Sequence, residues 1–127
     1  MVMADAVVNV DKLAGEIVLA IQTYTQDVSE AVDEAARETA KAIAADLRET
    51  SPKKTGEYAK GWTYRQEAPG SYRVYNKKKP QLTHLLEHGH AKRGGGRVEG
   101  RPHIKPAEDR YVPEFEKKVQ QILERGG

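Results

Sequence analysis

The longest apolar pattern in the chain runs through its N-terminal third. Between residues 10 and 49, apolar side chains recur at steps of three and four, which places them on one stripe of a helix. Residues 30–49 are rich in alanine and glutamate, which favour helix, and Pro52 stops it because proline disfavours helical geometry at the preceding residue. A straight helix of this length would measure about 60 Å. We therefore expect either a break near residues 22–25 or an N-terminal part that projects toward a partner.

Two shorter patterns follow in the middle of the chain. Residues 61–76 alternate large apolar and polar side chains around an Ala-Pro-Gly-Ser turn, which predicts a β-hairpin packed on the long helix. Pro80 suits the first position of a helix and Gly89 suits a left-handed stop, so we expect a short helix over residues 80–88.

The C-terminal pattern completes an α+β fold. We expect a short strand near residues 101–105, and apolar steps of three and four predict a helix over about 107–124. The sequence thus predicts a long N-terminal helix packed on a small antiparallel sheet, made of the hairpin and the short strand. It predicts one domain over residues 1–127, with a mobile basic Gly-rich loop at 91–101.

Composition excludes several classes of protein. The chain has no cysteine, which excludes disulfides, thiolate metal ligands and cysteine nucleophiles. Its apolar runs are far shorter than a membrane span, and its N-terminus lacks the pattern of a secretion signal. We therefore expect a soluble protein that is cytosolic where it is made and has no membrane partner.

Charge is unevenly distributed along the chain. Residues 77–105 carry eight Lys or Arg against two acids, a balance of +6, so the other residues sum to −4 in a chain of net charge +2. A basic segment on an otherwise acidic chain indicates a surface that meets a negative partner. The alternative is a solvated, mobile loop.

One short motif raises the question of zinc. His84, Glu87 and His88 form the H-x-x-E-H pattern of inverzincin metalloproteases. The two histidines are one helical turn apart, but they lie opposite a leucine stripe, and a third ligand would have to come from His90 or His103 on loops. We therefore expect no catalytic residue, no metal and no cofactor. A small zinc-dependent hydrolase, a small ribonuclease and a basic nucleic-acid-binding module remain the alternatives.

Three separated segments, read in order, resemble a known family. They are residues 51–62, 74–90 and 100–111, and they are similar to the tail-component family of long-tailed bacteriophages that includes gene product 10 of phage HK97. That family shows a long helix ending in Pro-x-x-Thr-Gly, a β-hairpin, a helix ending in Glu-x-Gly, a Gly-rich loop, and Pro-x-x-x-Pro-Ala before a C-terminal helix. The matching positions in this chain are Pro52, Thr55, Gly56, Glu87, Gly89, Pro102, Pro106 and Ala107.

The resemblance implies a non-enzymatic structural protein of the virion neck or tail end. It implies a ring of six copies that completes or joins the tail and lets DNA pass. Expected partners are further copies of the chain, head-connector proteins, and tail-terminator or tail-tube proteins, with assembly in the host cytoplasm.

The resemblance also suggests where contacts are made. Thr55 and Gly56 would shape the turn after the long helix, and Glu87 would pair with a lysine or arginine of the same or an adjacent subunit. The candidates for a subunit or neighbouring-ring interface are Thr55, Gly56, Glu87, Lys92, Arg93, Arg97 and Arg101. The candidates for contact with DNA in the channel, or with an acidic partner, are Lys77, Lys78, Lys79, Lys92, Arg93 and Arg97.

Overall fold

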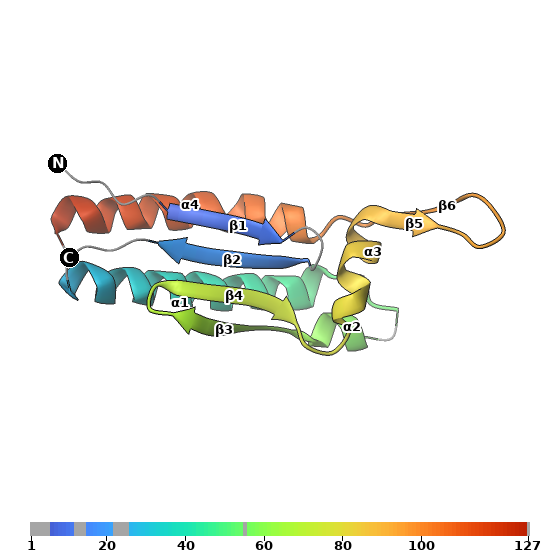
Figure 1. The fold of residues 1–127 in the computed structure, drawn as a ribbon, viewed down its shortest axis with the longest axis horizontal. Helices are drawn as coiled ribbons and strands as arrows, with labels where there is room; N and C mark the ends of the chain where they lie inside the picture. Colours follow the sequence, from blue (N-terminus) through green and yellow to red (C-terminus); the bar gives the residue numbers. More distant parts are fainter. Residues whose placement is uncertain (1–5, 12–14, 22–25, 55, 127) are drawn as a thin grey trace.

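A four-stranded antiparallel sheet packs against two long helices (Figure 1). The computed structural model describes residues 6–11, 15–21, 26–54 and 56–126. The sheet has the order β1-β2-β4-β3, and its strands are β1 (Ala6–Asp11), β2 (Glu16–Ile21), β3 (Trp62–Ala68) and β4 (Ser71–Asn76). The long helices are α1 (Gln26–Thr50) and α4 (Ile104–Arg125).

The remaining elements gather at one end of this two-layer body (Figure 1). They are α2 (Glu57–Lys60), the 3-10 turn η1 (Pro80–Leu82) and α3 (Thr83–His88). The strands β5 (Gly89–Ala91) and β6 (Arg97–Glu99) pair antiparallel as a ribbon that projects beyond the sheet. The expected α+β class, hairpin, short helix and C-terminal helix are confirmed.

The long helix is shorter than its periodicity predicts. It begins at Gln26, and residues 6–11 and 16–21 are strands instead of helix. Ile17 and Leu19 are both fully buried, two residues apart, as on one face of a strand. The β2 segment is rich in Val, Ile and Leu, and pairing with β4, as in Ile17 opposite Val74, stabilises it as a strand. The predicted break at 22–25 lies outside the described residues.

The predicted strand near residues 101–105 is also wrong. Residues 101–103 have no regular structure and α4 already begins at Ile104, while β2 takes the place expected for this strand beside the hairpin. Pro106 falls in the first turn of α4, where a missing N–H breaks no intrahelical hydrogen bond. Within the segment 91–101 the structure has the ribbon strand β6, and the mobility of that segment stays a prediction.

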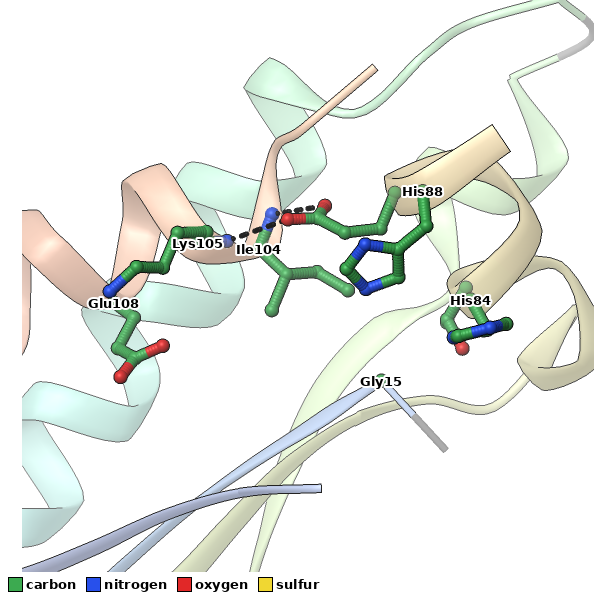
Figure 2. Close-up of a pocket in the computed structure, with 8 residues that line it drawn as sticks. Gly15, His84, His88, Ile104, Lys105 and Glu108 are labelled. Carbon is green, nitrogen blue, oxygen red and sulfur yellow. Dashed lines mark hydrogen bonds between the residues drawn. The ribbon is translucent and has the colours of Figure 1, made fainter. Parts of the chain in front are cut away.

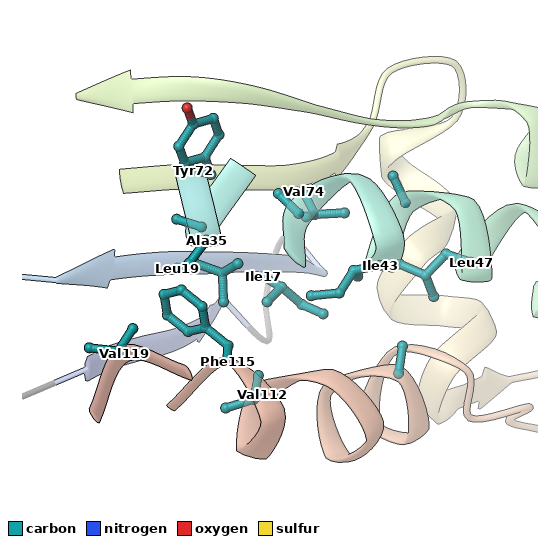
Figure 3. Close-up of a cluster of buried hydrophobic side chains, with 14 of the residues drawn as sticks. Ile17, Leu19, Ala35, Ile43, Leu47, Tyr72, Val74, Val112, Phe115 and Val119 are labelled. Atoms are coloured by element: carbon teal, nitrogen blue, oxygen red, sulfur yellow. The ribbon is translucent and has the colours of Figure 1, made fainter. Parts of the chain in front are cut away.

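The hydrophobic core lies between the sheet and the two helices (Figure 3). Ile17, Leu19 and Val74 contribute from the sheet, and Phe115 contributes from α4. The side of α1 that enters the core is rich in alanine, with Ala35, Ala36, Ala40 and Ala44 at most 1% exposed. Because these side chains are small, the sheet and α4 can both pack closely against α1.

Hydrogen bonds fix both ends of the hairpin to α1. At one end the Trp62 indole N–H donates to Ser51 Oγ over 2.8 Å, and Arg48 Nε donates to the Trp62 carbonyl over 2.9 Å. At the other end the Asp33 carboxylate accepts from the Gly70 N–H at 2.8 Å and from the Tyr72 hydroxyl at 3.0 Å. The contacts of Trp62 lie at the end of the molecule that carries α2, α3 and the ribbon, and they fix the start of β3 there.

Candidate functional site

The two histidines of the H-x-x-E-H pattern lie on the exposed side of α3 (Figure 2). Their ring centroids are 4.9 Å apart. With Gly15, Glu108 and others they line a cavity of about 240 Å³. Among the described residues, no group of three or more His, Cys, Asp or Glu side chains is arranged to hold a metal ion. Over that part of the chain, His84 and His88 therefore lack the third ligand that a catalytic zinc site takes.

Glu87, the third member of the pattern, caps the N-terminus of α4. It is 6% exposed. One carboxylate oxygen accepts from the N–H groups of His103 and Ile104, at 2.7 and 2.8 Å, and the other accepts from the Lys105 N–H at 2.9 Å. Figure 2 shows the bonds to Ile104 and Lys105 as dashed lines. These N–H groups have no partner within the helix, and the negative charge is favourable beside a helix N-terminus. The geometry gives Glu87 an intramolecular role, and its pairing with a neighbouring subunit stays a prediction.

His103, next to this cap, belongs to a buried hydrogen-bonded network. It is 2% exposed. Its Nδ1 lies 2.7 Å from the Arg101 carbonyl, which can only accept, so we place the ring proton on Nδ1. Nε2 then accepts from the Tyr58 hydroxyl at 2.7 Å. Burial lowers the pKa of His103, against smaller opposing effects of the Arg101 hydrogen bond and the Glu87 charge. Burial also raises the pKa of Tyr58 far above its usual value.

The cations of the basic segment lie at one end of the molecule, in the loop after β4, in the ribbon and around the start of α4 (Figure 1). Residues 77–79 follow β4, and Lys78 Nζ is 3.6 Å from a Glu57 carboxylate oxygen. Lys92 and Arg93 lie exposed between the ribbon strands, and Arg97 donates to the His88 carbonyl over 2.8 Å. Arg101 is exposed where the chain leaves the ribbon, and its backbone N–H donates to the Leu86 carbonyl over 2.7 Å. These positions are compatible with a shared partner, and the contacts themselves stay predictions.

The Thr-Gly turn is described in part. Thr55 lies outside the described residues. Gly56 has φ 85°, the left-handed conformation that favours glycine, and it stands directly before α2. It lines a cavity of about 300 Å³ together with Leu82 and Leu86.

Sequence reasoning missed two features of this end of the molecule. It did not connect Tyr58 with His103, because the two residues are 45 positions apart and no local pattern links them. It also missed that Lys53 and Lys54, which follow α1, line a cavity with Leu85 and with Val98 of the ribbon. The leucine spacing was the available signal, but it places Leu85 in the core, whereas this side chain is 40% exposed.

No helix in the described residues is long and apolar enough to cross a membrane. Residues 15–89 match the model of a protein family described as "Bacteriophage HK97-gp10, putative tail-component". The match covers more than half of the 127 residues and spans β2, α1, the hairpin and α3. No curated protein and no solved structure matches the chain.

The family match defines the class, that of phage tail components. The chain belongs to the HK97-gp10-like family.

Proposed function

We propose that this chain is a non-enzymatic structural protein of the phage virion, at the head–tail neck or the tail end. Six copies form a ring that completes or joins the tail and lets DNA pass, after assembly in the host cytoplasm. Its neighbours are the head-connector proteins and the tail-terminator or tail-tube proteins. Membership of a tail-component family supports the structural role.

The observation that carries the proposal is the separation of charge along the molecule. The segment with a balance of +6 lies at the end that carries α3 and the ribbon, and the remaining residues sum to −4 (Figure 1). A cationic end attracts DNA phosphates without reading sequence, and it also attracts an acidic face of a neighbouring ring. In both cases it gives the subunit a fixed orientation in an assembly.

The oligomeric state and position of the chain test this proposal directly. We expect native mass spectrometry, or cryo-electron microscopy of the particle, to find six copies as a ring at the neck or tail end. Native spectra recorded with one equivalent of zinc are expected to show no tightly held metal. Absence of the chain from purified particles would refute the proposal. A zinc ion that survives exchange into metal-free buffer would require a test for peptidase activity.

Charge reversal tests the role of the ribbon. We expect Lys92→Glu with Arg93→Glu to lower the yield of joined, infectious particles at least about tenfold, because the variant repels a negative partner. The matched control is Lys117→Glu with Lys118→Glu, which makes the same change of charge on exposed positions of α4. Normal yields from the ribbon variant would show that these cations make no contact in assembly.

A further inference from the structure

We propose that the end of the molecule between α3, the ribbon and the loop after α1 is a docking groove for an acidic, amphipathic segment of a different protein. The inference rests on the proposed function, which places other virion proteins against this chain. It adds a defined binding surface and the chemistry of its occupant.

Two adjoining cavities form the groove. One has a volume of about 570 Å³ and the other about 300 Å³. Both are lined by Pro52, Lys54, Leu82 and Leu86, so they share a wall. The larger cavity continues along the ribbon, and the smaller one continues toward α2. A single extended or helical segment can therefore cross both.

The floor of the groove is apolar. Leu82 and Leu86 are half-buried and packed against the core, which holds the floor in place. Leu85, at 40%, and Val98, at 38%, are the large hydrophobic side chains that are exposed within residues 15–20, 28–54 and 56–126. They come from different elements, yet both line the larger cavity. A single exposed leucine is ordinary, but two that converge in one hollow are typical of a binding site.

The rim of the groove is mainly cationic. Lys53, Lys54, Lys79 and Arg101 line the two cavities, against the carboxylates Glu57 and Glu99. Glu57 is itself close to a lysine, with 3.6 Å between its carboxylate oxygen and Lys78 Nζ. The cations between the ribbon strands lie at the same end of the molecule (Figure 1). An occupant with carboxylates beside its apolar side chains complements this surface.

A second copy of the chain fits the groove poorly. Among residues 15–20, 28–54 and 56–126, whose side-chain exposure the structure describes, large exposed hydrophobic side chains occur at the groove alone, so within that part of the chain a copy would match Leu85 and Val98 only with its own groove. That arrangement would place two cationic rims against each other, where they would repel. The exposed acids of α1, such as Glu30, Glu34 and Glu38, supply charge without such apolar side chains.

Duplex DNA also complements only the cationic rim of the groove and not its apolar floor. Phosphates would contact the lysines and arginines of the rim, but they offer no apolar surface to Leu85 and Val98. A peptide segment with apolar side chains at helical spacing, flanked by Asp and Glu, satisfies the floor and the rim together.

Site-specific photocrosslinking tests the groove. Leu85→p-benzoylphenylalanine is introduced into the chain during infection by its phage, and the crosslinked peptides are identified by mass spectrometry. We expect crosslinks to an acidic, apolar-containing segment of another phage protein, at least about fivefold above the same substitution at Glu116, an exposed position of α4. Lys54→Glu with Arg101→Glu should lower that yield about tenfold, whereas Lys117→Glu with Lys118→Glu should leave it unchanged.

Four outcomes would overturn the docking proposal: crosslinks to a second copy, crosslinks to DNA, a yield no higher than at Glu116, or a yield insensitive to the rim reversal. Circular dichroism of each purified variant checks its fold, and Val98→p-benzoylphenylalanine replaces the first probe if that one unfolds. The copy number of the chain in purified particles separates the two proposals. Groove crosslinks without the chain in particles would refute only the proposed function, and six copies without groove crosslinks would refute only the docking site.

Discussion

Glu87 provides at a distance the cap that α4 lacks locally. The residue that stands at the N-cap position, His103, makes no side-chain capping bond to the helix, and its imidazole bonds to Tyr58 instead. The carboxylate of Glu87 satisfies three N–H groups at the start of α4 and so ties that helix to α3. The sequence identified Glu87 as part of two motifs but gave no sign of this role, because its partners are 16 to 18 positions away.

We expect Glu87→Ala to lower the free energy of unfolding by about 2–4 kcal/mol, because it leaves buried N–H groups without an acceptor. Urea denaturation followed by circular dichroism measures the change. Glu116→Ala, at an exposed position of α4, is the control and should stay within about 0.5 kcal/mol of the parent protein. A loss no larger than that of the control would show that the cap is dispensable.

His103 should make stability depend on pH. Burial lowers the pKa of the folded imidazole below the unfolded value. Above the unfolded pKa of about 6.5 both states are neutral and His103 has no effect. As the pH falls below that value, the unfolded chain takes up a proton that the folded chain resists, so stability falls with a slope of at most about 1.4 kcal/mol per pH unit.

The measurement is the urea midpoint between pH 7.5 and 5. His103→Gln should reduce the slope. Tyr58→Phe keeps the buried imidazole and should therefore retain it. An unchanged slope in His103→Gln would assign the pH dependence to other groups.

At the scale of elements, the ribbon is joined to the body by a close approach of two glycines. Gly89 has φ 81°, and a Cβ there would lie 2.4 Å from the Val98 carbonyl oxygen. A Cβ on Gly100 would lie 2.6 Å from the Glu87 carbonyl oxygen. The Glu-x-Gly motif therefore combines a cap for one helix with a backbone crossing that any larger residue would obstruct.

We expect Gly89→Ala to destabilise the protein by about 2–4 kcal/mol, through the left-handed φ and the backbone clash. Gly94→Ala is the matched control, because a Cβ there meets nothing within 4 Å. Thermal unfolding of both variants measures the difference. Equal melting temperatures would mean that the crossing relaxes at little cost.

The elements found from the sequence and those missed differ in where their stability comes from. The hairpin at 61–76 has its own turn between β3 and β4, so its signal is local. The β2 segment has apolar residues that fit both a helical and a strand pattern, and contact with β4, more than 50 residues later, favours the strand. The same limit applies to the candidate groove, because Lys54, Leu85 and Val98 meet only in the folded chain.

At the scale of the whole molecule, we expect the stability of the fold not to depend on the tip of the ribbon. Residues 92–96 are exposed and connect Ala91 to Arg97, which are paired across the ribbon. Replacing residues 92–96 by Asn-Gly supplies a tight hairpin turn at the same pair. We expect the melting temperature to change by no more than about 2 °C, because no buried side chain is removed.

On the proposed function, the same variant should fail to join tails, since it loses two cations of the tip. Calorimetry and particle yield measure the two effects separately. A large loss of stability would show that the fold depends on the tip, and a normal yield would show that the tip makes no essential contact.

The crossing at Gly89 and Gly100 has a mechanical consequence for any load on the ribbon. Both ribbon strands join the rest of the molecule between the end of α3 and the start of α4. There the Arg101 N–H donates to the Leu86 carbonyl over 2.7 Å, and the Glu87 carboxylate caps α4. A pull or twist applied at the tip is therefore delivered to α3 and α4 together. On the proposed function, we therefore expect a force that a neighbouring protein applies to the ribbon to reach the core of this chain through that one joint.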